Sequence, residues 1–158
     1  MISSARRIRL CTALLVANLA LIWGNSLLSG ADSGAVSGGV VEWLMGLLGV
    51  PEAHEELVHT LIRKAAHFTE FACLGMLLCW RFGMAGERGA KIAYLPVLWA
   101  MAAALTDETI QMFTPDRGPS LTDVWIDTSG AAAGMMLLLF GHHLMKKIKH
   151  KHNLEETT

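Results

Sequence analysis

Ionisable side chains recur within segments of the sequence that are otherwise apolar, and their spacing could support chemistry. On one predicted helix, Arg63, His67 and Glu70 are spaced i, i+4, i+7 and form a single stripe. Lys64 lies at the edge of this stripe. A histidine between a base and an acid can transfer protons or bind a ligand, because its charge changes near neutral pH. His67 and Glu70 are therefore candidates for a general base and its orienting partner.

Two later apolar segments carry acids in a similar arrangement. Asp107 and Gln111 share one helical face, and Glu108 lies beside it. Asp123 and Asp127 share a face of the last helix. A charge that faces lipid near the bilayer centre costs roughly 2.5–3.5 kcal/mol, so each stripe must face water or the interior of a bundle. Asp107 and Glu108 are further candidates for catalytic carboxylates.

Basic side chains nearly balance these acids. Arg63 and Lys64 lie on the first stripe, and Arg117 comes from the turn-rich loop 114–120. We expect three helices and this loop to bring about nine ionisable groups to one outward-facing pocket. The alternative is a set of buried ion pairs that only fix helix register. The candidate binding residues are Arg63, Lys64, Gln111, Arg117, Asp123, Asp127, Asn25 and Ser26.

The elements that must position these residues are long apolar helices. The chain of 158 residues has 53% hydrophobic residues and only 17% charged ones, with a mean hydropathy of +0.40. A bilayer core needs about 20 mostly apolar residues as a helix. Four segments qualify, at about 10–28, 63–80, 92–113 and 121–145. We predict one all-α domain over residues 1–158, a bundle of four transmembrane helices. The net charge of −1 argues against nucleic-acid binding.

The basic residues predict the orientation of these spans. Residues 30–62 contain five acids and no base. With a cytoplasmic N-terminus, ten of the thirteen bases lie inside, so we predict that both termini are cytoplasmic. The first span also resembles a signal peptide, because bases precede it and Ser29-Gly30-Ala31 follows it, but we expect it to be retained. The inner bases are Arg6, Arg7, Arg9, Arg81, Arg88, Lys91, Lys146, Lys147, Lys149 and Lys151.

A shorter apolar segment follows the first span. Residues 33–39 are small and polar and predict a linker. Residues 40–50 are apolar but too short to cross a bilayer. They predict either a segment on the outer membrane surface, with Trp43 at headgroup depth, or a helix packed on the bundle. Gly130 and Gly134 form a GxxxG motif, which allows another helix to approach closely.

Together these motifs resemble those of the VanZ-like family of bacterial membrane proteins. Residues 63–71 resemble the first signature of the family. Residues 25–26 and 40–43 are similar to its segment after the first helix, so the resemblance covers roughly residues 20–135. The second signature is matched by Thr106-Asp107-Glu108 with Gln111, then Pro115 and Arg117, then Asp123-Val124, Asp127 to Gly130, and Gly134.

The sequence departs from the family pattern at two positions. Ile110 stands where the family often has histidine, which removes a ligand that a multi-histidine metal site would use. Asp116 stands where the family often has the glycine of Pro-Gly-Arg, which alters the turn that presents Arg117. The resemblance implies a protein of the bacterial plasma membrane that acts in the cell envelope. Family members are associated with resistance to teicoplanin, but the resemblance implies no particular reaction.

Three functions remain open. The first is a binding module without a cofactor, which holds the headgroup of an anionic amphiphile such as a membrane lipid, a lipid-linked precursor or a lipoglycopeptide. The second is an intramembrane enzyme that modifies a lipid or lipid-linked headgroup by histidine and carboxylate acid–base chemistry, with the acids able to hold a divalent cation. Movement of protons or ions is a third alternative, although residues 92–104 offer no polar path.

Overall fold

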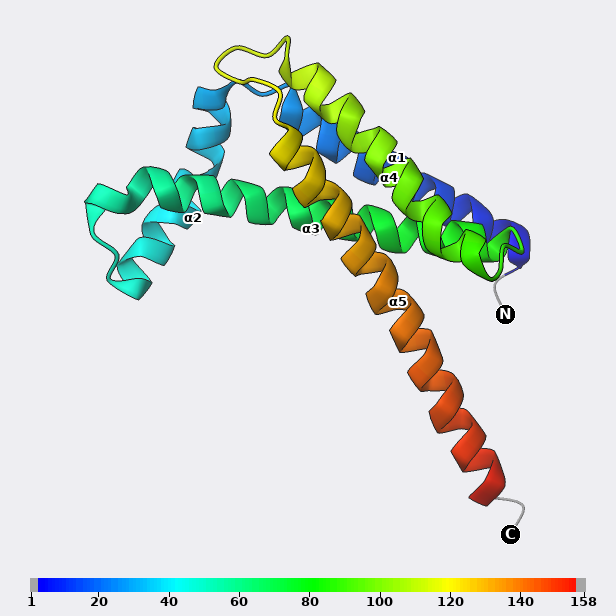
Figure 1. Cartoon of the computed structure of the whole chain (residues 1–158). Helices are drawn as coiled ribbons and strands as arrows, with labels where there is room; N and C mark the ends of the chain where they lie inside the picture. The colour runs from blue at the N-terminus through cyan, green and yellow to red at the C-terminus, as the bar shows by residue number, and fades with distance from the viewer. Residues whose placement is uncertain (1–2, 156–158) are drawn as a thin grey trace.

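The computed structural model describes residues 3–155, including all their side chains except those of 30–37, 151, 154 and 155. It contains five α-helices and one 3-10 turn, Glu52–His54, and no strand occurs in the described range. The predicted all-α class is therefore confirmed (Figure 1). The α-helices are α1 Ser4–Ser26, α2 Gly30–Leu48, α3 Glu55–Met84, α4 Ala90–Gln111 and α5 Leu121–Glu155.

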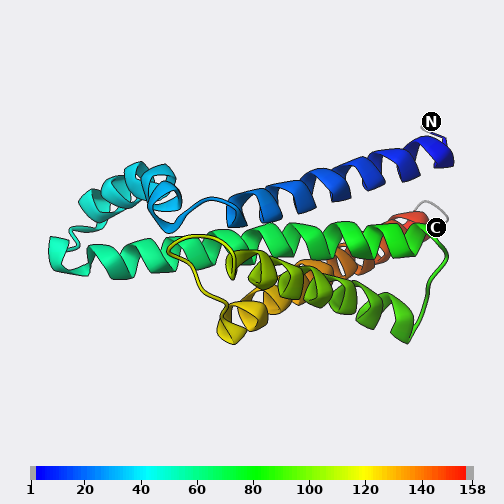
Figure 2. The same ribbon diagram turned by 90° about the horizontal axis from the view of Figure 1, so that it is seen from above.

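Helix α3 is the central element, and each of the other four α-helices contacts it. Helix α1 runs along one side of α3, and α4 folds back beside both of them (Figure 2). Helix α5 crosses α3 obliquely, and its C-terminal half projects beyond the bundle (Figure 1). The end of α1, the end of α4 and the start of α5 consequently meet in one region, together with the loop that joins α4 to α5.

The crossing of α3 and α5 depends on glycines, because the two backbones touch there. A Cβ added at Gly130 would overlap the carbonyl of Phe68, and one added at Gly134 would overlap the carbonyl of Ala72. Gly75 of α3 lies in the same way against the backbone of Ala131. The close helix approach predicted from the GxxxG motif is therefore present, and its partner is α3.

The apolar core lies where α1, α3, α4 and α5 meet. Its largest members are Ile22, Phe71 and Leu74, and alanines such as Ala100 and Ala104 fill the space between the helices. Small side chains permit short distances between helix axes. This core holds the four helices in a fixed relation to one another, which the polar residues beside it require.

Two helices are long and apolar enough to cross a membrane, namely α1 over Ser4–Ser26 and α5 over Leu121–His150. Only 11% of the apolar window of α1 is buried, whereas the core helix of a soluble protein is mostly buried. Helices α3 and α4 do not meet this measure, and both carry charged residues within their apolar stretches, such as Glu70 and Arg81 in α3 and Lys91 and Asp107 in α4. The count of four spans stays a prediction.

The prediction of a linker at 33–39 was wrong, because α2 runs unbroken from Gly30 to Leu48. Glycine and serine are weak helix formers, so the local composition favours a linker, whereas the stretch is part of a longer helix that contacts α3. The apolar segment 40–50 lies mostly within α2, which contacts α3, but several of its large apolar side chains are exposed. Trp43 is 66% exposed, and its place at a membrane surface stays a prediction.

Replacement of Gly134 by alanine is expected to destabilise the protein by roughly 1–3 kcal/mol, because the added methyl group collides with the Ala72 carbonyl. The matched control is Gly141→Ala on the same helix, where nothing lies within 4 Å of the added Cβ. That change is expected to be neutral or stabilising, because alanine is the better helix former. Thermal unfolding in detergent measures both, and equal stability of the two variants would contradict the proposed contact.

Candidate functional site

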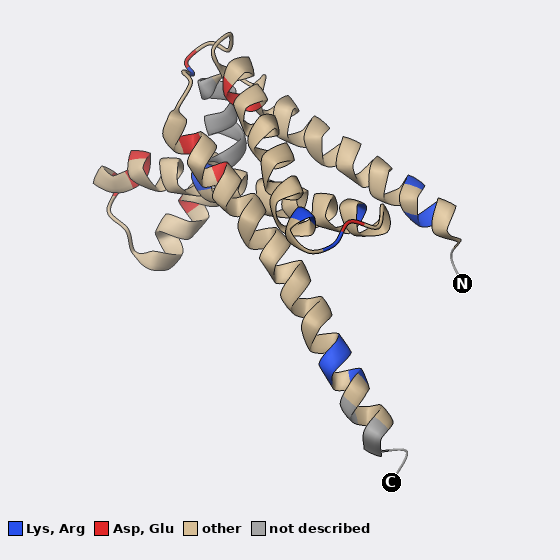
Figure 3. Cartoon of the chain, turned by 45° about the vertical axis from the view of Figure 1, so that its right-hand side comes forward, with Lys and Arg blue, Asp and Glu red and all other residues tan. Residues whose placement is uncertain are grey.

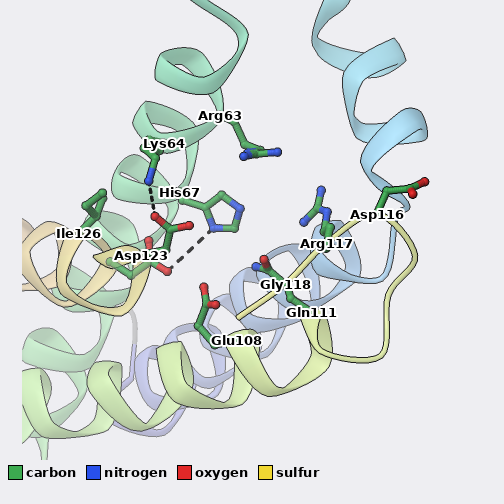
Figure 4. A pocket seen from close by; sticks show the side chains of 11 residues that line it. Arg63, Lys64, His67, Glu108, Gln111, Asp116, Arg117, Gly118, Asp123 and Ile126 are labelled. Atoms are coloured by element: carbon green, nitrogen blue, oxygen red, sulfur yellow. Dashed lines mark hydrogen bonds and ion pairs between the residues drawn. The ribbon is translucent and has the colours of Figure 1, made fainter. Parts of the chain in front are cut away.

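A charged cavity of about 130 Å³ lies where α3, α4, α5 and the α4–α5 loop meet. Helix α3 provides three basic or histidine side chains, α4 and α5 provide mainly acids, and the loop closes one side (Figure 4). The shared region predicted from the separate stripes is therefore present. The lining residues are Arg63, Lys64, His67, Glu108, Gln111, Asp116, Arg117, Gly118, Asp123, Ile126 and Asp127.

Helices α3 and α5 face each other through two polar contacts. Lys64 forms an ion pair with Asp123, and both side chains are about one-third exposed. One turn deeper, Nδ1 of His67 lies 4.0 Å from Oδ2 of Asp127 (Figure 4). The i, i+3 and i, i+4 spacings along the two helices place these pairs at successive levels of the same crossing.

Asp107 anchors the buried side of the site and is 0% exposed. The hydroxyl of Ser26 donates to its Oδ1 at 2.6 Å, and Nε2 of Gln111 donates to its Oδ2 at 2.8 Å. The hydroxyl of Thr114 in turn donates to the carbonyl of Ser26 at 2.9 Å. Both oxygens of this carboxylate are thus partnered, which offsets the cost of taking it out of water. These contacts tie the end of α1 to the end of α4.

The loop that follows α4 is fixed by Glu108 and Ser120. The backbone N–H of Ser120 donates to Oε2 of Glu108. The side-chain oxygen of Ser120 accepts from the N–H of Asp123 at 3.3 Å, so Ser120 caps α5. Glu108 therefore holds the start of α5 close to the end of α4.

Arg117 is presented by a turn with a left-handed residue. Asp116 has a φ of 58°, a conformation that glycine adopts freely and that aspartate tolerates better than most residues. The departure from Pro-Gly-Arg therefore preserves the turn. Burial, and then the positive charge of Arg63, lower the pKa of the Arg117 guanidinium from its ordinary value. This group nevertheless stays charged at neutral pH.

Three buried polar atoms at the cavity have no hydrogen-bond partner among the described residues, namely Oε1 of Glu108, Oδ1 of Asp127 and Nε of Arg117. A buried polar group without a partner costs about 1–3 kcal/mol. In addition, neither Arg63 nor Arg117 forms an ion pair within residues 3–155. The site therefore has unused capacity to bind both an anion and a cation.

Of the twelve residues that we predicted for the site, eight line the cavity. Asp107 and Ser26 lie beneath it, joined by their hydrogen bond. Glu70 and Asn25 do not line it. Instead, Nδ2 of Asn25 donates to Oε1 of Glu70 at 2.8 Å. The structure thus places Asp127, rather than the predicted Glu70, opposite the Nδ1 atom of His67. The eight lining residues are Arg63, Lys64, His67, Glu108, Gln111, Arg117, Asp123 and Asp127.

Sequence reasoning missed three of the lining residues, Asp116, Gly118 and Ile126. Asp116 and Gly118 flank Arg117 in the chain, so the turn-rich sequence around Arg117 could have indicated that they line the cavity too. Ile126 is an apolar residue next to Asp127 on an apolar helix, and no signal in the sequence distinguishes it from its neighbours.

A family model described as VanZ/LLP1 matches residues 11–142 of the chain. The match includes every residue of the cavity and the α1 residues beneath it. No curated protein and no solved structure matches the chain.

Replacement of Ser26 by alanine is expected to destabilise the protein by about 1.5–3 kcal/mol, because a hydrogen bond to a buried carboxylate is lost. Thr109→Ala is the control, because that exposed hydroxyl bonds only the Leu105 carbonyl of its own helix. The control is expected to change stability by less than about 0.5 kcal/mol. Thermal unfolding in detergent measures both, and equal losses would show that Ser26 is not an anchor for Asp107.

Proposed function

Because the chain belongs to the VanZ/LLP1 family, we propose that it is a membrane protein of the bacterial cell envelope whose charged cavity binds the headgroup of an anionic amphiphile. A membrane lipid, a lipid-linked precursor and a lipoglycopeptide such as teicoplanin share this chemistry. Each combines a phosphate or carboxylate with an apolar tail.

The distribution of charge supports a membrane topology with the cavity outward. Most basic residues lie at the start of α1, near the turn between α3 and α4, and along the far part of α5, whereas most acids lie around the cavity and at the start of α3 (Figure 3). The three bases at the cavity, Arg63, Lys64 and Arg117, are the exceptions. Cytoplasmic flanks of membrane helices are enriched in lysine and arginine. In the proposed topology all four predicted spans cross the bilayer, and both termini are cytoplasmic.

The observation that carries the proposal is the pair of arginines without ion-pair partners. The side chains of Arg63 and Arg117 both point into the opening in front of His67 (Figure 4). Two cations that face one space repel each other, so an anion between them would be favourable. Guanidinium groups also match phosphate and carboxylate oxygens through bidentate hydrogen bonds.

Exposed apolar side chains on the segments that carry the cavity residues suit the tail of such a ligand. Met112, Phe113, Leu121 and Trp125 lie at the end of α4, in the loop and at the start of α5, and each is more than half exposed. Exposed apolar groups in this number are typical of a surface that contacts lipid or a ligand. A headgroup in the cavity would therefore leave its chains against these residues and the bilayer.

Arg117→Ala is expected to weaken the binding of short-chain phosphatidylglycerol by about tenfold or more, because a charge-assisted hydrogen bond is lost. The control is Arg88→Ala, which removes a charge from the α3–α4 turn, away from the cavity. Native mass spectrometry of the detergent-purified protein measures both, with phosphatidylcholine as the zwitterionic comparison. Equal affinity of the wild type and Arg117→Ala would refute the binding proposal.

The contact between His67 and Asp127 favours a second candidate, an intramembrane enzyme that acts on the same headgroup. A carboxylate facing Nδ1 can orient the imidazole and leave its other nitrogen to act as a base. For this candidate, His67→Ala is expected to abolish a change in headgroup or acyl-chain composition that the wild type causes when expressed. Lipid extraction and mass spectrometry measure that change, with His59→Ala on the same helix as the control. Identical lipid profiles for the wild type and His67→Ala would exclude the reaction.

A further inference from the structure

We propose that His67, Asp107 and Asp127 form a binding site for one divalent metal ion at the floor of the cavity. The three residues come from α3, α4 and α5 respectively, so the ion would join the three helices that make the site. This inference goes beyond the proposed function, because it concerns a second ligand that binds without any amphiphile.

The geometry of the three side chains is close to that of a coordination shell. One potential ligand atom from each residue lies within 4.8 Å of the other two. Two ligands of one ion stand at most about 4.2 Å apart, since each bond is about 2.1 Å long. The 4.0 Å between Nδ1 of His67 and Oδ2 of Asp127 already satisfies this limit. A pair of ligand atoms that stands 4.8 Å apart would need a side-chain movement of about half an ångström to reach the same limit.

An independent observation points to a missing partner at the same place. Asp127 is 1% exposed and lines the cavity, yet its Oδ1 atom has no hydrogen-bond partner. Its Oδ2 atom faces the imidazole of His67 at a distance too long for a hydrogen bond. A buried carboxylate with neither oxygen satisfied is costly, and a cation between these residues would satisfy it.

The outer contacts of Asp107 are those of a metal ligand. Ser26 and Gln111 each donate to one oxygen of this carboxylate, and Nε2 of Gln111 also lies 3.3 Å from the Ser26 hydroxyl. Carboxylates that coordinate metals are commonly held by such hydrogen bonds, which fix their orientation. Each carboxylate oxygen keeps a second lone pair, so these donors leave room for coordination.

The net charge of the site also favours a divalent cation. Its acids outnumber its permanent cations by two, and one divalent ion would restore the balance. The carboxylates are Asp107, Glu108, Asp116, Asp123 and Asp127, and the permanent cations are Arg63, Lys64 and Arg117.

The donor set indicates which class of ion fits. One imidazole with two carboxylates suits Mn²⁺ or Zn²⁺ better than Ca²⁺, which takes six to eight oxygen ligands. Three protein ligands would leave coordination positions directed at the cavity, where Arg63 and Arg117 also point. A phosphate group could then bridge the ion and a guanidinium. This last step rests on the proposed function, whereas the metal site itself does not.

The test is Mn²⁺ titration of the full-length, tag-free protein in detergent, with free Mn²⁺ measured by its electron paramagnetic resonance signal. The wild type is expected to bind one Mn²⁺ per chain, and Asp127→Asn to weaken this binding by more than about tenfold. Ser26→Ala, which removes a hydrogen bond that orients Asp107 and none of the three proposed ligands, is expected to weaken it by about tenfold. Glu70→Gln is the matched control, because it removes one carboxylate outside the cavity.

Two results would overturn the inference. One is the absence of saturable binding of either Mn²⁺ or Zn²⁺. The other is equal affinity of the wild type, Asp127→Asn and Glu70→Gln, which would place the ion elsewhere, for example on the histidines of the α5 tail. Circular dichroism and gel filtration verify that each variant is folded, and the conservative change from carboxylate to amide keeps the shape of the side chain.

A separate measurement distinguishes this inference from the proposed function. Phosphatidylglycerol binding is measured after treatment with EDTA and again after addition of Mn²⁺. Stronger lipid binding with Mn²⁺ supports both statements. Lipid binding that is indifferent to Mn²⁺, in a protein that binds no Mn²⁺, overturns the metal site alone. Mn²⁺ binding without lipid binding supports the metal site and overturns the proposed function.

Discussion

The direct backbone contact between α3 and α5 is the constraint on which the rest of the structure depends. Gly130 and Gly134 carry no Cβ, so α5 lies against the carbonyls of α3 without intervening side chains. This contact brings His67 and Asp127 to opposite walls of one small space. With larger residues at the crossing the same stripes would stand further apart, and the cavity would be an open groove. The close packing of α5 on α3 therefore determines the width of the cavity.

The polar residues divide into those that are satisfied and those that are not. Asp107 and Asp123 are each held by neighbouring donors, so they explain how the helix ends are joined. Asp127, Arg63 and Arg117 are left with unused binding capacity. A site that served only to fix helix register would be expected to pair its charges, because a buried charge without a partner is strongly unfavourable. The unequal distribution of partners is thus the main argument for a ligand.

Helical periodicity was sufficient to predict the general location of the site, because it assigns each residue to a face. It assigned His67 and Asp127 to stripes that face one region, and the turn-rich loop between the last two helices added Arg117. It did not predict that His67 would face Asp127 while Glu70 turned to Asn25, because that choice depends on how the helices cross. The helical state of 33–39 was also missed, because glycine and serine are weak helix formers and the local sequence does not show that the longer helix α2 contacts α3.

The tight crossing has a consequence for how related proteins can diverge. At Gly134 even one added carbon meets a backbone atom of α3. Substitutions at this crossing therefore cannot change the spacing of the two helices, and with it the shape of the cavity, in small steps. The turn that carries Arg117 is different, because Asp116 and Gly118 are exposed and Gly118 has nothing within 4 Å of an added Cβ. Evolutionary changes in ligand preference are therefore expected to accumulate in this loop, above a floor that stays nearly invariant.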